Sequence, residues 1–268
     1  MIKLLRANFH RLLMDKVFWI AVACMAGEAV FLCIVGHHAN SNMPLDTIVL
    51  SCFGFSGMAI PGVVMAVVCT LFVGKEYAGG TIRNKLIIGK TRESIYFANV
   101  ITCVVVGLVL ELAYLLFGIA IGLPLFGGFT ESPEKVMAVL GIGTLLMAFY
   151  ASVITAITML ARNQTTAIII NLLSVIIVMF VSMYLIDRID APEFFMTDEG
   201  LVKNSYCPSV MLKNLYRFII NILPTGQSVA LTAYTQVARL WEMPIYSTCM
   251  IAAVNTAGVL AFKRLDLK

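Results

Sequence analysis

The chain has 268 residues, of which 60% are hydrophobic and only 13% are charged, and its formal net charge is +4. Soluble domains carry about 25% charged residues, so this chain has too little charge to cover a water-exposed surface. The composition excludes an ordinary soluble protein and predicts a single membrane-embedded domain of residues 1–268. The positive charge lies in short loops beside apolar stretches, which does not indicate nucleic-acid binding.

Residues 1–16 are predicted to form a helix that lies in the membrane interface. Apolar residues recur there at helical spacing, and four cations accompany them, as expected for a helix facing anionic lipid. Residues 17–36 follow as the first span. They number about twenty, which is enough to cross a hydrocarbon core of roughly 30 Å.

Five further spans are predicted at residues 51–74, 97–122, 135–160, 165–186 and 244–262. Pro61 falls inside the second of them and is expected to kink it. Residues 187–243 form a long outer segment. The fold class predicted is an all-α membrane protein with six transmembrane helices, an interfacial N-terminal helix, a short inner helix and amphipathic outer helices before the last span.

The distribution of cations predicts the orientation. Thirteen Lys and Arg residues lie at the two termini and in two loops of one side, whereas Lys135 alone lies in a short loop of the other side. Because short cytoplasmic loops carry an excess of Lys and Arg, both termini are expected to be cytoplasmic.

Residues 75–93 form a polar, basic loop between two spans. Thr81 is expected to cap a helix that begins at Ile82, and Gly89 is expected to end it. Ile82 and Leu86 would then share one face, with cations around them. This pattern is typical of a docking helix, although composition alone favours an ordinary positively charged inner loop.

The motif Glu76-x-x-x-Gly80-Thr81, followed by Ile82-Arg83-Asn84-Lys85 and Gly89-x-x-Arg92, resembles the first cytoplasmic loop of type-2 ATP-binding-cassette (ABC) permeases. It is most similar to the bacterial branch that exports bacteriocins or protects against lantibiotics and bacitracin. The resemblance extends to the whole plan of the chain. It implies that this loop carries a coupling helix that sits in a groove of a separate ATPase subunit, with docking candidates Glu76, Gly80, Thr81, Ile82, Arg83, Lys85 and Leu86.

The same resemblance implies the permease subunit of an exporter in the bacterial cytoplasmic membrane. Two ATPase copies would bind ATP and Mg²⁺, while this chain would bind no cofactor or metal and would not be an enzyme. A second copy or a related permease would complete the pathway within membrane lipid. The expected substrate is an amphipathic peptide, an antibiotic or a lipid-like compound. Gly89-Lys90-Thr91 is not the end of a phosphate-binding loop, because Asn84 stands where that motif needs glycine.

The outer segment contains an amphipathic stretch at residues 209–223, which is too short and too cationic for a span and suits an interfacial or re-entrant helix. Thr225 is expected to cap a second amphipathic helix that runs to about Trp241. By resemblance to the family, such paired helices form an outer gate. An outer segment without a gating role remains equally open. The gate candidates are Lys213, Arg217, Pro224 and Gly226.

Two acids, Glu28 and Glu111, fall within predicted spans. A charge at mid-bilayer costs several kcal/mol unless it is paired, hydrated or neutralised, so each acid is a candidate functional residue. Each could pair with a polar group such as Asn171 or Asn255, line a substrate cavity or carry protons. The last role supports an alternative function, an ATP-independent carrier or channel. An intramembrane enzyme is disfavoured, because the sequence contains no catalytic motif. His37-His38 is expected to lie in a solvated loop rather than to bind a metal.

Overall fold

The computed structural model describes residues 1–39, 44–53, 59–197, 200–204, 206–232 and 241–265. Six of the described helices are long and apolar enough to cross a membrane, which confirms the all-α membrane fold and its six spans. They are α2 (Lys16–Ala39), α4 (Ile60–Ala78), α6 (Arg92–Phe126), α7 (Pro133–Ala161), α8 (Gln164–Asp190) and α11 (Met243–Arg264).

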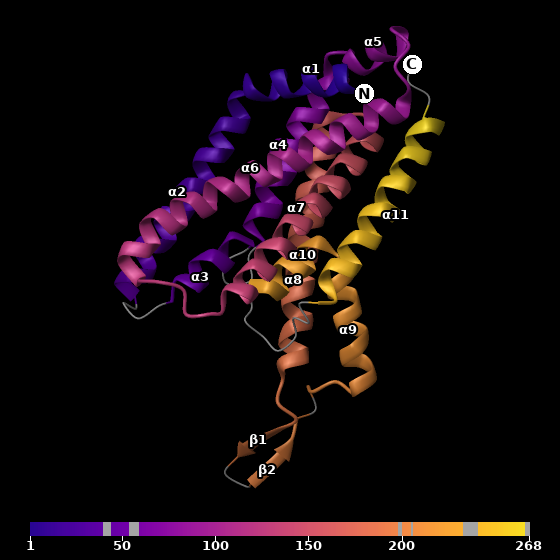
Figure 1. Cartoon of the computed structure of the whole chain (residues 1–268). Coiled ribbons are helices and arrows are strands. Elements are labelled where there is room, and N and C mark those ends of the chain that lie inside the picture. Colours follow the sequence, from indigo (N-terminus) through magenta and orange to yellow (C-terminus); the bar gives the residue numbers. More distant parts are fainter. Residues whose placement is uncertain (40–43, 54–58, 198–199, 205, 233–240, 266–268) are drawn as a thin grey trace.

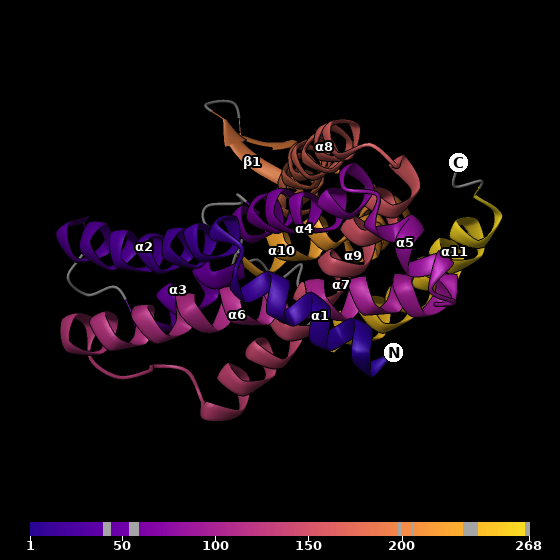
Figure 2. The same cartoon turned by 90° about the horizontal axis from the view of Figure 1, so that it is seen from above.

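Two short helices lie at one end of the bundle. These are α1 (Ile2–Leu13) and α5 (Thr81–Ile87), and the C-terminal end of α11 lies beside them (Figures 1 and 2). We call this the α5 end. An antiparallel hairpin of β1 (Phe194–Thr197) and β2 (Gly200–Lys203) stands at the opposite end (Figure 1). This hairpin was not predicted, because the outer segment was expected to be helical.

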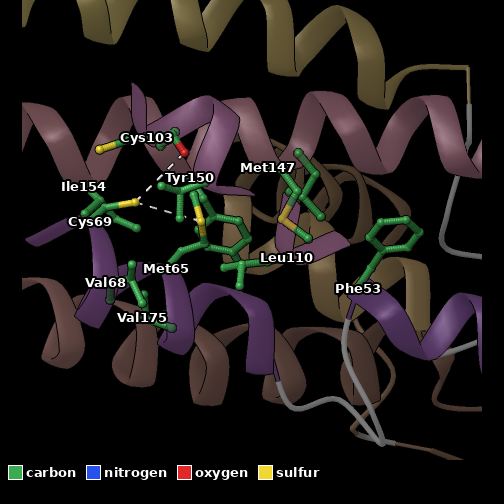
Figure 3. Close-up of a cluster of buried hydrophobic side chains, with 14 of the residues drawn as sticks. Phe53, Met65, Val68, Cys69, Cys103, Leu110, Met147, Tyr150, Ile154 and Val175 are labelled. Carbon is green, nitrogen blue, oxygen red and sulfur yellow. Dashed lines mark hydrogen bonds between the residues drawn. The ribbon is translucent and has the colours of Figure 1, made fainter. Parts of the chain in front are cut away.

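The core lies where α4, α6, α7 and α8 meet. Figure 3 shows Met65, Met147 and Tyr150 gathered there, with the Cys69 thiol facing the Cys103 carbonyl oxygen at 4.0 Å. In a membrane the lipid is as apolar as these side chains, so close packing rather than exclusion from water holds the helices together. Glycines serve this packing. Gly143 of α7 lies against the Phe53 ring, and a Cβ there would overlap it.

The second span differs from its prediction. It begins at Ile60, and the chain before it forms α3 (Leu45–Leu50) and a 3-10 turn (Ser51–Phe53). Pro61 therefore lies in the first turn of α4, where its missing N–H breaks no hydrogen bond, and the predicted kink is wrong. Residues 54–58, which were expected inside this span, lie outside the described residues. The expected loop at His37-His38 is also wrong, since α2 continues to Ala39.

The third span is longer than predicted. Its 35 residues correspond to about 52 Å at 1.5 Å per residue, well beyond a hydrocarbon core of about 30 Å. Thr91 caps its start, where the hydroxyl oxygen accepts a hydrogen bond from the Ser94 N–H at 3.3 Å. The helix is therefore longer than the apolar layer is thick, and its first turn, at the α5 end, carries the cation Arg92.

The outer segment returns into the bundle. After α9 (Val210–Ile222), the helix α10 (Pro224–Thr232) packs against α7 and α8 (Figure 1). Residues 224–231 are buried, and Ser228 donates a hydrogen bond to the Phe53 carbonyl. The second outer helix thus begins at Pro224, and Thr225 is not its cap. The predicted extension toward Trp241 falls on residues 233–240, which lie outside the described residues.

Substituting Gly143→Ala is expected to destabilise the bundle by about 1–3 kcal/mol, because the new methyl group overlaps the Phe53 ring in a closely packed core. Gly141→Ala, two positions earlier in α7, is the control, since a Cβ there meets no atom within 4 Å. Thermal unfolding in detergent measures the difference. Equal melting temperatures for the two variants would contradict this description of the core.

Candidate functional site

The most constrained polar group at the α5 end is the carboxylate of Glu76, in the last turn of α4. Its side chain has no exposed surface, and its Oε1 atom lies 2.9 Å from Nη1 of Arg11. Lys85 Nζ donates to the same oxygen at 2.5 Å, and Asn99 Nδ2 donates to Oε2 at 3.0 Å. The carboxylate therefore joins α4 to three other helices, α1, α5 and α6.

The Glu76 contacts belong to a larger set of polar side chains. Asn8 Nδ2 donates to Asn99 Oδ1 at 2.9 Å, and Lys85 Nζ lies 3.4 Å from Asn8 Oδ1. Both asparagines are buried. We call these side chains the Glu76 network: Asn8, Arg11, Glu76, Lys85 and Asn99. A buried polar network whose members are paired restricts the arrangement of its helices.

The local sequence explains how α5 reaches this position. Gly80 has φ +63°, a left-handed conformation that turns the chain from α4 into α5. Thr81 is the first residue of α5 rather than its predicted cap, and its hydroxyl donates to the Glu76 carbonyl at 3.1 Å. Gly89 has φ +82°, and the Lys90 N–H bonds to the Lys85 carbonyl at 3.0 Å. Gly89 thus ends the helix as predicted.

The two faces of α5 differ from the predicted pattern. Ile82 is 2% exposed, and Leu86 packs against the core, so the apolar face expected for docking points into the protein. The outward face carries Ile87 and Ile88, which are 74% and 76% exposed. Sequence analysis missed both residues. The run Leu86-Ile87-Ile88 could have predicted this exposure. Three consecutive side chains cannot share one helix face, so at least one of these apolar residues had to point outward.

The exposed surface of the turn and helix also includes Gly80 and the polar residues Thr81, Arg83 and Asn84. Among the predicted docking residues, Glu76, Ile82, Lys85 and Leu86 instead face the protein. The structure therefore separates the predicted set into residues that hold α5 and residues that α5 presents.

Arg92 joins the start of α6 to the end of α11. Its Nη1 atom donates to the carbonyl oxygens of Phe262 and Lys263, both at 2.9 Å, and also to that of Leu265. Carbonyl groups in the last turn of a helix lack partners within the helix, so the guanidinium satisfies them. Lys263 also pairs with Glu93. The basic loop is thereby attached to the last span as well.

The sequence model of the ABC-2 family transporter protein matches residues 4–181, well over half of the chain. The chain belongs to the ABC-2 transporter family. It is a multi-pass membrane permease subunit of an ABC transporter, and its family implies partnership with an ABC ATPase. A comparison with curated proteins gives no significant match. The matched range contains the whole Glu76 network and ends within α8.

The two intramembrane acids of this permease lie on neighbouring helices, α2 and α6. Glu111 is buried and Glu28 is half-buried, and one carboxylate oxygen of each has no hydrogen-bond partner in the described structure. The Cys52 thiol faces the backbone carbonyl oxygen of Glu111 at 3.9 Å.

The asparagines expected as partners for these acids bind elsewhere. Asn171 Nδ2 donates to Thr70 Oγ1 at 2.8 Å and to Thr158 Oγ1 at 3.0 Å. Asn255 Nδ2 donates to Ser152 Oγ at 2.9 Å. The expected pairing of the acids with Asn171 or Asn255 is therefore not formed.

The four gate candidates occupy the two outer helices. Lys213 and Arg217 are half-buried on α9, close enough to Asp190 of α8 for electrostatic interaction. Pro224 and Gly226 are buried in α10. A Cβ at Gly226 would collide with the Ile220 carbonyl oxygen, so glycine permits the tight return of α10 onto α9.

Gln227 is a buried residue of α10 that sequence analysis missed. Its Nε2 atom donates to the Asn221 carbonyl at 2.7 Å. Ser247 of α11 donates to its Oε1 atom, also at 2.7 Å. A glutamine in a stretch of mixed polarity gives no signal of burial. Arg92 binds α11 at the α5 end, and Gln227 shows that the other end of α11 is hydrogen-bonded to α10.

Glu76→Gln is expected to destabilise the α5 end by about 2–3 kcal/mol, because it leaves Arg11 and Lys85 facing a neutral amide in a largely buried site. The melting temperature of the permease should fall, and backbone amides of α5 should exchange hydrogen faster. Asp15→Asn is the control. It removes the charge from the pair of Asp15 with half-exposed Lys75 and should cost less than about 1 kcal/mol. Equal effects of the two substitutions would count against the network.

Proposed function

We propose that this permease couples ATP hydrolysis by two ATPase subunits to the export of an amphipathic peptide, an antibiotic or a lipid-like compound. The observation that carries the proposal is the arrangement of α5. On one face of this helix Lys85 binds the Glu76 carboxylate of α4, which in turn binds Arg11 of α1 and Asn99 of α6, and the opposite face is exposed. A helix that transmits a movement of the ATPase to the membrane spans needs both an attached face and an exposed face.

The outward face of α5 has the chemistry of a small docking site. Ile87 and Ile88 supply apolar anchors, and Arg83 supplies a cation at the edge. Apolar anchors at the centre of an interface carry most of the binding energy, while charged rims set orientation. The cation distribution favours a cytoplasmic location for this end, where an ATPase would reach it.

Two connections would carry a displacement of α5 into the membrane. The Glu76 network joins α5 to α1, α4 and α6. Arg92 joins the start of α6 to α11, and the Ser247–Gln227 hydrogen bond joins α11 to α10. Long-range coupling requires a continuous chain of such contacts. A second permease copy or a related permease would form the other wall of the pathway.

The docking proposal is tested by the double substitution Ile87→Ser/Ile88→Ser and, separately, by Arg83→Glu. Each should reduce recovery of an ATPase encoded beside the permease at least about tenfold in co-purification, a loss of about 1.4 kcal/mol. Substrate-stimulated ATP hydrolysis should fall in parallel. Arg264→Glu, an exposed cation at the same end, should leave recovery unchanged. Full recovery of the ATPase with both the double substitution and Arg83→Glu would contradict a docking role for α5.

An ATP-independent carrier is the second candidate, because Glu28 and Glu111 each keep a carboxylate oxygen without a hydrogen-bond partner in the described structure. Proton-gradient-driven flux into liposomes of permease alone distinguishes the two functions. The exporter proposal expects no flux above that of empty liposomes. Flux that Glu28→Gln and Glu111→Gln both abolish would instead favour the carrier.

A further inference from the structure

One face of α2 carries a stripe of residues that opens on the side of the bundle. Cys24, Gly27, Glu28 and Phe31 follow one another at helical spacing, so they share a face. Opposite them lie Ile60 and Val64 from the first turns of α4. These residues line a groove of about 420 Å³ between α2 and α4, within the range typical of ligand-binding cavities.

The groove is accessible from the bilayer. Cys24 and Gly27 are exposed, and 62% of the Phe31 side chain is exposed. Glu28 lies twelve residues after Lys16, which is about 18 Å along the helix axis and therefore close to the middle of the apolar layer. A molecule dissolved in the lipid would reach the groove without crossing the protein.

Among the described residues that line this groove, Glu28 is the one carboxylate. Its Oε1 atom is buried and has no hydrogen-bond partner in the described part of the chain. A carboxylate at this depth costs several kcal/mol unless it is hydrated, neutralised by a proton, or paired with a cation or hydrogen-bond donor. A ligand that brings a positively charged donor into an otherwise apolar groove would supply this compensation.

We infer that the groove binds an amphiphile that enters from the bilayer and carries a protonated primary amine on a single apolar chain. The ammonium group pairs with Glu28, and the chain lies along Phe31, Ile60 and Val64. Glu111 does not take part, because it is 3% exposed and lies outside the lining. The role of the groove as an entry site for exported substrate rests on the proposed function, whereas the binding itself does not.

Cys24 provides a reporter within the groove. The permease, without ATPase, is placed in nanodiscs of electrically neutral lipid and treated with N-ethylmaleimide, and labelling is read peptide by peptide. Dodecylammonium should slow labelling of Cys24 with a midpoint at least about tenfold lower than that of dodecanol, which has the same chain and no charge. Cys249, an exposed thiol of α11, should label at the same rate throughout.

Two variants assign the effect to one carboxylate. Glu28→Gln should abolish the preference for the amine, and Glu111→Gln should preserve it. Displacement of a dansyl-labelled dodecylamine, read by fluorescence, gives the same comparison independently of thiol reactivity. Equal protection by amine and alcohol, or an unchanged preference in Glu28→Gln, would overturn the inference. A Cys24–Cys24 cross-link between copies would also overturn it, because the groove would then be an interface. ATPase recovery is a separate readout, so failure of the coupling proposal would leave this result standing.

Discussion

The arrangement of the α5 end depends on one buried carboxylate. Glu76 has no exposed surface, and it can remain charged there because Arg11, Lys85 and Asn99 surround its two oxygens. Such a cluster adds little net stability compared with apolar packing, but removal of one member leaves the others uncompensated. The role of the Glu76 network is to fix the positions of the helices that it joins relative to one another. Four helices meet at one charge, so α5 cannot shift alone.

The two ends of the permease are linked through the last span. Arg92 satisfies the final carbonyl groups of α11 at one end, and Gln227 of α10 bonds to Ser247 near its other end. Because α10 is buried, a movement of α11 would be passed to a buried helix rather than to a surface loop. The groove at Glu28 lies between α2 and α4, neither of which takes part in this link through α11. Binding there is measured on the permease alone, whereas the proposed coupling at α5 is measured with the ATPase.

Hydropathy predicted the six spans, because long apolar stretches leave a membrane chain few alternatives. The capping preference of glycine predicted the helix stop at Gly89, whose left-handed conformation favours this residue. Burial of polar residues was harder to predict. Glu76 and Arg83 stand in the same basic loop, yet only Glu76 is buried, because residues from α1 and α6 close over it. The Asn8–Asn99 contact spans 91 positions, and no local pattern reports such a distance. The kink predicted at Pro61 was wrong because it depends on where α4 begins. The exposure of Ile87 and Ile88 was missed because it depends on which face of α5 the neighbouring helices cover.

The Glu76 network requires that α1 and α5 move as one unit with the spans that hold them. Spin labels at Ile2→Cys and Asn84→Cys, both exposed positions, in a background without Cys24, Cys207 and Cys249, measure the distance between these helices by pulsed electron paramagnetic resonance. In the complex of permease and ATPase, the α1–α5 distance distribution should stay the same with and without ATP, while Glu76→Gln should broaden it. A nucleotide-dependent change of this distance with Glu76 intact would contradict the account.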